Sequence, residues 1–173
     1  MSCSRSIDES ASLARRRVLL AGATLVALPG CGPRAVLPDF AYTLLDGRPA
    51  HTQALRGKVV LVNFWATSCT SCVAEMPQLV ATHLRFQARG FETLAVAMSH
   101  DAPASVAQFA ESRRLPFGVV IDNTGAIARA WGDVKLTPTT FLLDRRGALV
   151  ERYVGAPDFD ALHGRIERLQ AEA

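Results

Sequence analysis

The segment that most constrains the fold runs from Lys58 to Phe64. Four apolar residues, Val59-Val60-Leu61-Val62, follow one another in it, and Phe64 ends it. A short Val-rich run of this kind is typical of a strand that is buried on both faces, as in a parallel or mixed sheet. Apolar side chains then recur at helical spacing from Cys72 to Arg89, and Gly90 ends that pattern. The sequence therefore predicts a central strand that is followed closely by an amphipathic helix.

Strand-like and helix-like segments alternate along the rest of the chain. We expect strands at 40–45, 91–98, 117–121, 139–143 and 149–154, and helices at 103–114, 127–131 and 158–170. Alternation of this kind predicts an α/β fold in which helices flank a central mixed sheet through right-handed crossovers. The segment at 40–45 would add a strand or hairpin at the N-terminal side.

Composition and charge exclude several classes of protein. The chain has 173 residues, of which 49% are hydrophobic and 20% charged, so it can bury one core and is not a disordered or collagen-like chain. The net charge is +3, but four arginines and two acidic residues within positions 1–30 account for +2 of it. The remaining body is close to neutral and lacks the basic surface that nucleic-acid binding requires.

The N-terminal segment has the pattern of an export signal. Arg15-Arg16-Arg17 precede an apolar run, Val18 to Leu28, which is far shorter than the roughly 20 residues that span a bilayer. Leu28-Pro29-Gly30-Cys31 resembles a bacterial lipobox, so Cys31 is a candidate for lipidation, and a non-lipidated or uncleaved signal is the alternative. The paired arginines also resemble a twin-arginine signal. We predict an export signal at 1–30, a tether at 31–38 and one domain at 39–173, located on the periplasmic face and anchored to the membrane.

Two cysteines in the body, Cys69 and Cys72, stand at the junction between the central strand and its helix. The unpaired N–H groups of a first helical turn stabilise a thiolate there, and a partner one turn further on can form a disulfide with it. This pattern favours a reversible catalytic dithiol. A structural disulfide, a thiol peroxidase and a zinc site remain as alternatives, but zinc would need two further ligands at matching spacing. The four histidines are scattered, and we expect His83 and His163 to be partly exposed on their helices.

Residues 62–77, Val-Asn-Phe-Trp-Ala-Thr-Ser-Cys-Thr-Ser-Cys-Val-Ala-Glu-Met-Pro, resemble the active-site strand and helix of the thioredoxin superfamily. Within it, the chain is most similar to the exported TlpA/ResA-like thiol-disulfide oxidoreductases. Thr137-Pro138-Thr139 is similar to the cis-proline loop of that family, and the segment at 141–147 to its following hairpin. The resemblance covers about residues 37–171 and implies a thioredoxin-like fold.

The resemblance also implies roles for individual residues. Cys69 would be the attacking thiol and Cys72 the resolving thiol. Pro138 would be the cis-proline, which leaves the backbone of Thr137 free to pair with a bound chain. Glu75 would be an acid that exchanges protons with the dithiol; the alternative is an exposed acid in the first helical turn. Trp65 would pack beneath the site, which is compatible with an ordinary position in the core.

Two departures from the family bear on specificity. Ser68 stands where many members have Trp, and the residues between the cysteines are Thr70 and Ser71, without proline or histidine. Partner contacts at Ser68 would therefore be more polar. No cation lies between the sulfurs to favour a strong oxidant. The resemblance implies a reductant, with the Cys69–Cys72 disulfide as its redox group and no metal or other cofactor.

The resemblance implies partners as well as chemistry. These would be protein disulfide or thiol substrates in cytochrome c maturation or copper-centre assembly, together with a membrane electron donor; we expect a monomer.

Two alternative functions are a Cu(I)-binding metallochaperone and a peroxiredoxin-like peroxidase. The first would have a Cys-x-x-x-Cys with a distant His, and the second a single cysteine with upstream Pro and Thr. Neither pattern matches the residues present.

Overall fold

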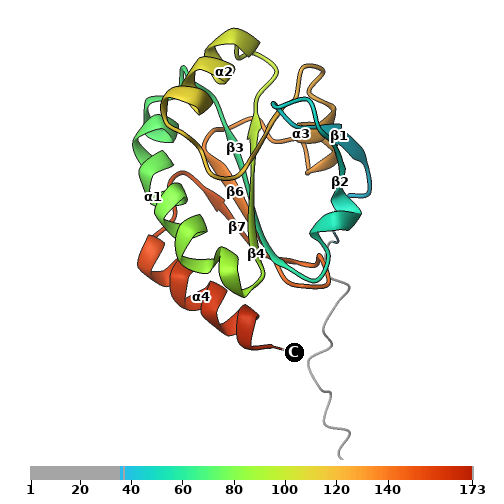
Figure 1. Cartoon of the computed structure of the whole chain (residues 1–173), viewed down its shortest axis with the longest axis vertical. Coiled ribbons are helices and arrows are strands. Elements are labelled where there is room, and N and C mark those ends of the chain that lie inside the picture. The colour runs from blue at the N-terminus through green and yellow to red at the C-terminus, as the bar shows by residue number, and fades with distance from the viewer. Residues whose placement is uncertain (1–35, 37, 173) are drawn as a thin grey trace, which may run out of the picture. The chain divides into compact units, whose positions relative to one another are not determined.

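A five-stranded mixed sheet forms the centre of the domain in the computed structural model, which describes residue 36 and residues 38–172 (Figure 1). The strand order is β5-β4-β3-β6-β7; β3, β4 and β5 run parallel, and β6 and β7 are antiparallel to their neighbours. The strands are β3 (Val59–Trp65), β4 (Phe91–Ala97), β5 (Gly118–Ile121), β6 (Thr139–Leu143) and β7 (Leu149–Val154). All seven residues of β3 are buried, as the apolar run predicts.

Helices cover both faces of this sheet (Figure 1). They are α1 (Thr70–Phe86), α2 (Pro103–Ser112), α3 (Ala126–Ala130) and α4 (Phe159–Ala171), and a 3-10 turn at Gln87–Arg89 follows α1. One core lies on the side of α1, α2 and α4, where Leu61 and Trp65 point from β3; the other lies on the side of α3, where Val62 and Phe64 point. Because successive side chains of β3 point to opposite faces of the sheet, this strand contributes to two separate cores.

A two-stranded hairpin precedes β3. It consists of β1 (Ala41–Thr43) and β2 (Pro49–His51), and a 3-10 turn at Thr52–Leu55 leads on to β3. An isolated bridge between Leu44 and Val120 connects the hairpin to the edge strand β5. The expected additional N-terminal hairpin is thus present, although β2 and the 3-10 turn give no separate signal in the sequence.

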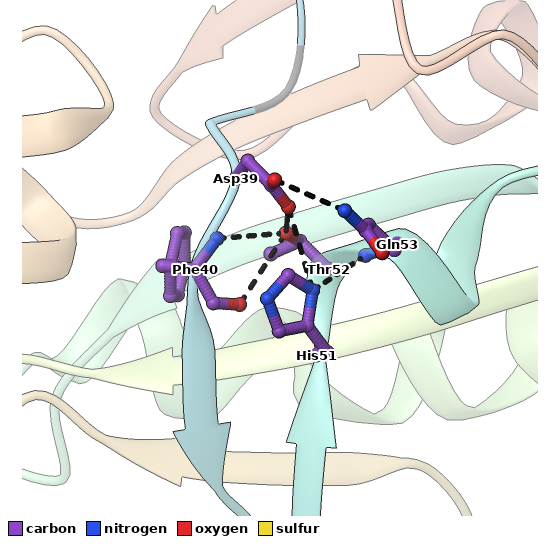
Figure 2. Close-up of polar contacts among 5 residues, drawn as sticks. All are labelled: Asp39, Phe40, His51, Thr52 and Gln53. Atoms are coloured by element: carbon purple, nitrogen blue, oxygen red, sulfur yellow. Dashed lines mark hydrogen bonds and ion pairs between the residues drawn. The ribbon is translucent and has the colours of Figure 1, made fainter.

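Polar contacts join the residues at the start of β1 to those at the end of β2 (Figure 2). The Asp39 carboxylate accepts a hydrogen bond from Gln53 Nε2 at 3.1 Å and lies 3.4 Å from both Thr52 Oγ1 and His51 Nδ1. The backbone N–H of Phe40 donates to Thr52 Oγ1 at 3.0 Å. The chain entering β1 is therefore attached to the residues that follow β2.

The observed elements agree with the expected ones to within a few residues. The largest difference near the cysteines is the start of α1, which begins at Thr70 and not at Cys72, because Cys69 is its N-cap. Pro77 lies inside this helix without ending it.

The predicted export signal, Cys31 and most of the tether fall outside the described residues. In the part of the chain that the structure describes, none of the helices is long and apolar enough to cross a membrane.

Candidate active site

A disulfide joins Cys69 and Cys72 where β3 passes into α1, with 5.2 Å between the two Cα atoms. The extended backbone of Cys69 places its Sγ over the first turn of the helix, where it accepts a hydrogen bond from the Cys72 N–H at 3.2 Å. Cys72 is fully buried, whereas Cys69 is partly exposed. A partner molecule can therefore reach Cys69 Sγ but not Cys72 Sγ.

Ser71 adds a second polar contact to the exposed sulfur. Its Oγ lies 3.4 Å from Cys69 Sγ, and its hydroxyl donates, because a disulfide sulfur carries no proton. After reduction, the same hydroxyl and the Cys72 N–H face a thiolate at the positive end of α1. Hydrogen bonds to the charged form and the helix dipole both favour ionisation of a cysteine at this position.

The loop before β6 lies directly against the disulfide. The Thr137–Pro138 peptide bond is cis, and the carbonyl oxygen of Thr137 is 3.6 Å from Cys69 Sγ. Pro138 is buried, and its carbonyl accepts a hydrogen bond from the Gly155 N–H at 2.8 Å. The structure thus brings the two segments that the sequence predicts for the site, Cys69–Cys72 and Thr137–Pro138, into contact.

Two exposed apolar side chains flank this loop. Leu136 directly precedes Thr137 and is 65% exposed. Val154 is 58% exposed and pairs in register with Thr139, directly after Pro138. Ser68, Thr70 and Ser71 are also exposed, so the surface around Cys69 combines apolar and hydroxyl side chains.

Glu75 lies in the interior, one turn after Cys72 on α1. It is only 4% exposed, so the alternative of a solvated first-turn acid is wrong. Asn63 Nδ2 on β3 donates to Glu75 Oε1 at 2.9 Å, and the same nitrogen donates to Thr140 Oγ1 on β6 at 2.9 Å. Burial raises the pKa of Glu75 to about 7, although the hydrogen bond from Asn63 acts in the opposite direction. The group can therefore gain or lose a proton near neutral pH.

Sequence reasoning missed the roles of Asn63 and Thr140, and for Asp101 it favoured a plain loop start over a part in the site. Asp101 is buried after β4, and its carboxylate accepts hydrogen bonds from the backbone N–H and the hydroxyl of Thr67. It therefore holds the loop that leads into Cys69. The only signal was its place after a parallel strand, at the edge of the sheet where sites gather in α/β folds.

Trp65 is fully buried beneath this loop. Its ring packs against Phe109 of α2 with 5.1 Å between centroids, in the same core as Cys72. This placement matches an ordinary core position, and support of the site by Trp65 stays a prediction. Among the described residues, no group of three or more His, Cys, Asp or Glu side chains could hold a metal ion.

Comparison with known proteins gives a consistent result. A model of the Redoxin family matches residues 33–163. The thiol-disulfide oxidoreductase ResA of Geobacillus thermodenitrificans is 35% identical over 133 residues, which cover 77% of this chain and 75% of that protein. ResA of Bacillus thuringiensis strain Al Hakam is 32% identical over 132 residues, covering 76% of this chain and 75% of the relative.

Solved structures show the same fold. A structure from Neisseria meningitidis, described as a thioredoxin, superposes with a TM-score of 0.75 at 34% identity, covering 82% of this chain and 93% of the other. A thiol:disulfide interchange protein of the thioredoxin family from Chlorobium tepidum gives a TM-score of 0.74 at 24% identity, covering 82% and 99%. The fold is therefore thioredoxin-like, as the resemblance implied. With its Cys69–Cys72 disulfide, the chain belongs to the Redoxin family of the thioredoxin superfamily and is a thiol-disulfide oxidoreductase similar to ResA.

Proposed function

We propose that this protein is an exported, membrane-tethered reductant of disulfides in partner proteins. The observation that carries the proposal is the asymmetry of the disulfide: Cys69 is partly exposed at a helix N-terminus, and Cys72 is fully buried behind it. Such a pair can open toward a partner through one sulfur and close again through the other.

The proposed reaction has two steps. The Cys69 thiolate attacks a partner disulfide, so that a mixed disulfide forms and one partner thiolate leaves. Cys72 then attacks Cys69 Sγ, the bond to the partner breaks, and the second partner thiolate leaves. The two protein thiols are oxidised to a disulfide while the partner disulfide is reduced to two thiols. Glu75 accepts the proton that Cys72 loses, since it lies one turn away and its pKa is raised to about 7.

The surface around Cys69 supports a protein as the partner. Thr137 carries its backbone beside the sulfur, and an extended chain lying there would meet Leu136 and Val154 on either side of the loop. Exposed apolar side chains next to a reactive group favour recognition of a polypeptide over that of a small polar disulfide. Ser68, Thr70 and Ser71 would contribute polar contacts.

The location and pathway follow from the N-terminal pattern and the family. We propose that residues 1–30 direct export, that Cys31 is lipidated, and that residues 31–38 tether the domain at 39–173 to the periplasmic face. An exported reductant needs a membrane electron donor to return Cys69 and Cys72 to the dithiol. Haem-attachment or copper-site thiols are the proposed clients, and the domain would act as a monomer.

Trapping tests the proposed roles of the two cysteines. In the Cys72→Ser variant of the full chain, we expect a stable mixed disulfide with a disulfide-containing protein such as insulin, because the resolving thiol is missing. The matched Cys69→Ser variant should trap nothing. If both variants trap equally well, the assignment of attacking and resolving sulfur is wrong.

The reduction potential of the Cys69–Cys72 pair tests the direction. A value near about −270 mV, as in thioredoxin, or lower supports a reductant, whereas a value near about −120 mV would make the protein a disulfide donor. Stoichiometric retention of Cu(I) without insulin reduction would instead favour a copper chaperone. Rapid consumption of peroxide would favour a peroxidase.

A further inference from the structure

Asn63 is a polar residue in the middle of the central strand. It is fully buried, and in register it lies between Ala95 of β4 and Thr140 of β6. Its side chain points to the face that α1 covers, where Nδ2 donates to both Glu75 Oε1 and Thr140 Oγ1. A buried amide is costly unless it is hydrogen-bonded, so this position calls for an explanation beyond packing.

These contacts determine which way the amide faces. Both hydrogens of Nδ2 are used, one by Glu75 and one by Thr140. Reversing the amide would place its carbonyl oxygen against the Glu75 carboxylate and would lose that bond, whereas the Thr140 hydroxyl can donate to the reversed oxygen. In the observed orientation Thr140 accepts the second hydrogen of Nδ2, so it supports the orientation in which Asn63 presents a donor to Glu75.

A fixed donor makes the two oxygens of Glu75 inequivalent. Oε1 faces an N–H group that has no lone pair to accept a proton, so a proton on Oε1 cannot point toward Asn63. Oε2 is buried and has no hydrogen-bond partner among the described residues. When Glu75 is protonated, its proton therefore belongs on Oε2.

We infer that Asn63 and Thr140 are positioning residues that hold Glu75 Oε1 as an acceptor and leave Oε2 as the atom that exchanges the proton. The inference rests on the proposed function, in which Cys72 passes its proton to Glu75. In that step the S–H bond of Cys72 breaks, the proton binds Oε2, and the freed sulfur attacks Cys69. The partner thiolate leaves with the electron pair of the broken bond, and no further oxidant or reductant is required.

Few titratable groups face the cluster formed by Asn63, Glu75 and Thr140. Cys69 and Cys72 lie on its own helix, with His83 two turns further on. From β7, Tyr153 lies next to Thr140, and Glu151 lies on the same face, paired with Arg165 of α4. Burial raises the pKa of Tyr153 to about 12, so its hydroxyl stays protonated while Glu75 titrates. The hydrogen bond from Asn63 lowers the pKa of Glu75 against the effect of burial.

The test is an NMR titration of the Glu75 carboxyl carbon in the oxidised full chain. Asn63→Leu removes the donor at similar volume, and we expect the midpoint to rise by about one to two pH units, a ten- to hundredfold gain in proton affinity. Thr140→Val frees the amide and should raise the midpoint by a smaller amount. Thr140→Ser keeps the hydroxyl and should restore the original midpoint.

Thr93→Val is the matched control. Thr93 is also a buried strand threonine, but its hydroxyl contacts His83 and not Asn63, so the Glu75 midpoint should not move. An unchanged midpoint in Asn63→Leu would overturn the inference. If that variant does not fold, equal midpoints in Thr140→Val and Thr140→Ser would overturn it instead.

The titration is separate from the test of the proposed function. It uses the oxidised protein alone, so a wild type that fails to reduce insulin refutes the function and leaves the hydrogen-bond assignment standing. A shifted midpoint in Asn63→Leu, together with an unchanged pH profile for the rate at which Cys72 resolves a mixed disulfide on Cys69, would confirm the hydrogen bond and overturn its part in proton exchange.

Discussion

Asp101 accepts hydrogen bonds from both the backbone N–H and the hydroxyl of Thr67, the latter at 2.6 Å, and so links the loop after β4 to the loop before Cys69. We expect Asp101→Asn to lower the free energy of unfolding by about 1.5–3 kcal/mol, because hydrogen bonds to a charged acceptor are lost or weakened. Urea unfolding of the oxidised protein, followed by Trp fluorescence, measures the change. The control is His100→Ala, at the exposed neighbouring residue, which should change the free energy of unfolding little. An equal loss of stability in both variants would mean that any substitution in this loop destabilises the protein.

Ser71 should affect the ionisation of Cys69 in the reduced protein. Its hydroxyl lies 3.4 Å from Sγ and would stabilise the thiolate. Ser71→Ala should therefore raise the pKa of the Cys69 thiol, because the hydroxyl no longer stabilises the thiolate. Thiolate absorbance during a pH titration reports the change. Ser105→Ala, on the surface of α2, is the control, and a Ser71→Ala pKa equal to that of wild type would argue against the contact.

Glu75 should make the protein less stable as the pH rises. Its pKa is raised from 4.5 to about 7, so between these values the folded state holds a proton that the unfolded state has released. Stability is then lost as the pH rises through this window, by about 3 kcal/mol in all. Glu75→Gln cannot titrate, so its stability relative to wild type should increase over the same window. Glu111→Gln, on the exposed side of α2, provides the comparison, and parallel pH profiles for Glu75→Gln and wild type would contradict the prediction.

His163 should have the opposite effect. The Thr82 hydroxyl donates to the Gln78 carbonyl at 2.7 Å, so it accepts from His163 Nε2, and Nδ1 is left to accept from Arg85. Burial, and then the charge of Arg85, lower the pKa of this imidazole below 6.5.

The unfolded state therefore takes up a proton that the folded state resists, and stability falls as the pH drops below about 6.5. His163→Gln should lose less stability on acidification than wild type, as measured by urea unfolding at a series of pH values. A variant as sensitive to acid as wild type would show that His163 does not contribute.

The sequence predicts the parts of the molecule whose signal is local. The valine-rich run predicts β3, and the spacing of apolar residues predicts α1 and α4, because each pattern lies within one element. The contact between Cys69 and Thr137 was expected only through the family resemblance, since no local pattern links positions so far apart in the chain.

Contacts between distant elements account for the rest. Thr140 looks like any strand residue until β6 pairs with β3 and places it beside Asn63. His83 was expected to be partly exposed, yet it is 3% exposed, because Thr93 of β4 and the ring of Phe117 pack against its imidazole. Helical periodicity places a residue on a face of its helix, but it does not say how far the neighbouring layer extends over it.

Cys69, the N-cap of α1, is also one of the two residues that change oxidation state. The bond from the Cys72 N–H to Cys69 Sγ uses a sulfur lone pair, which is present in the disulfide, in a mixed disulfide and in the thiolate alike. The end of the helix can therefore stay capped throughout a catalytic cycle. Opening and closing of the disulfide then requires a side-chain rotation and little movement of the backbone. The oxidised and reduced forms should therefore differ mainly in the position of one sulfur atom, Cys69 Sγ.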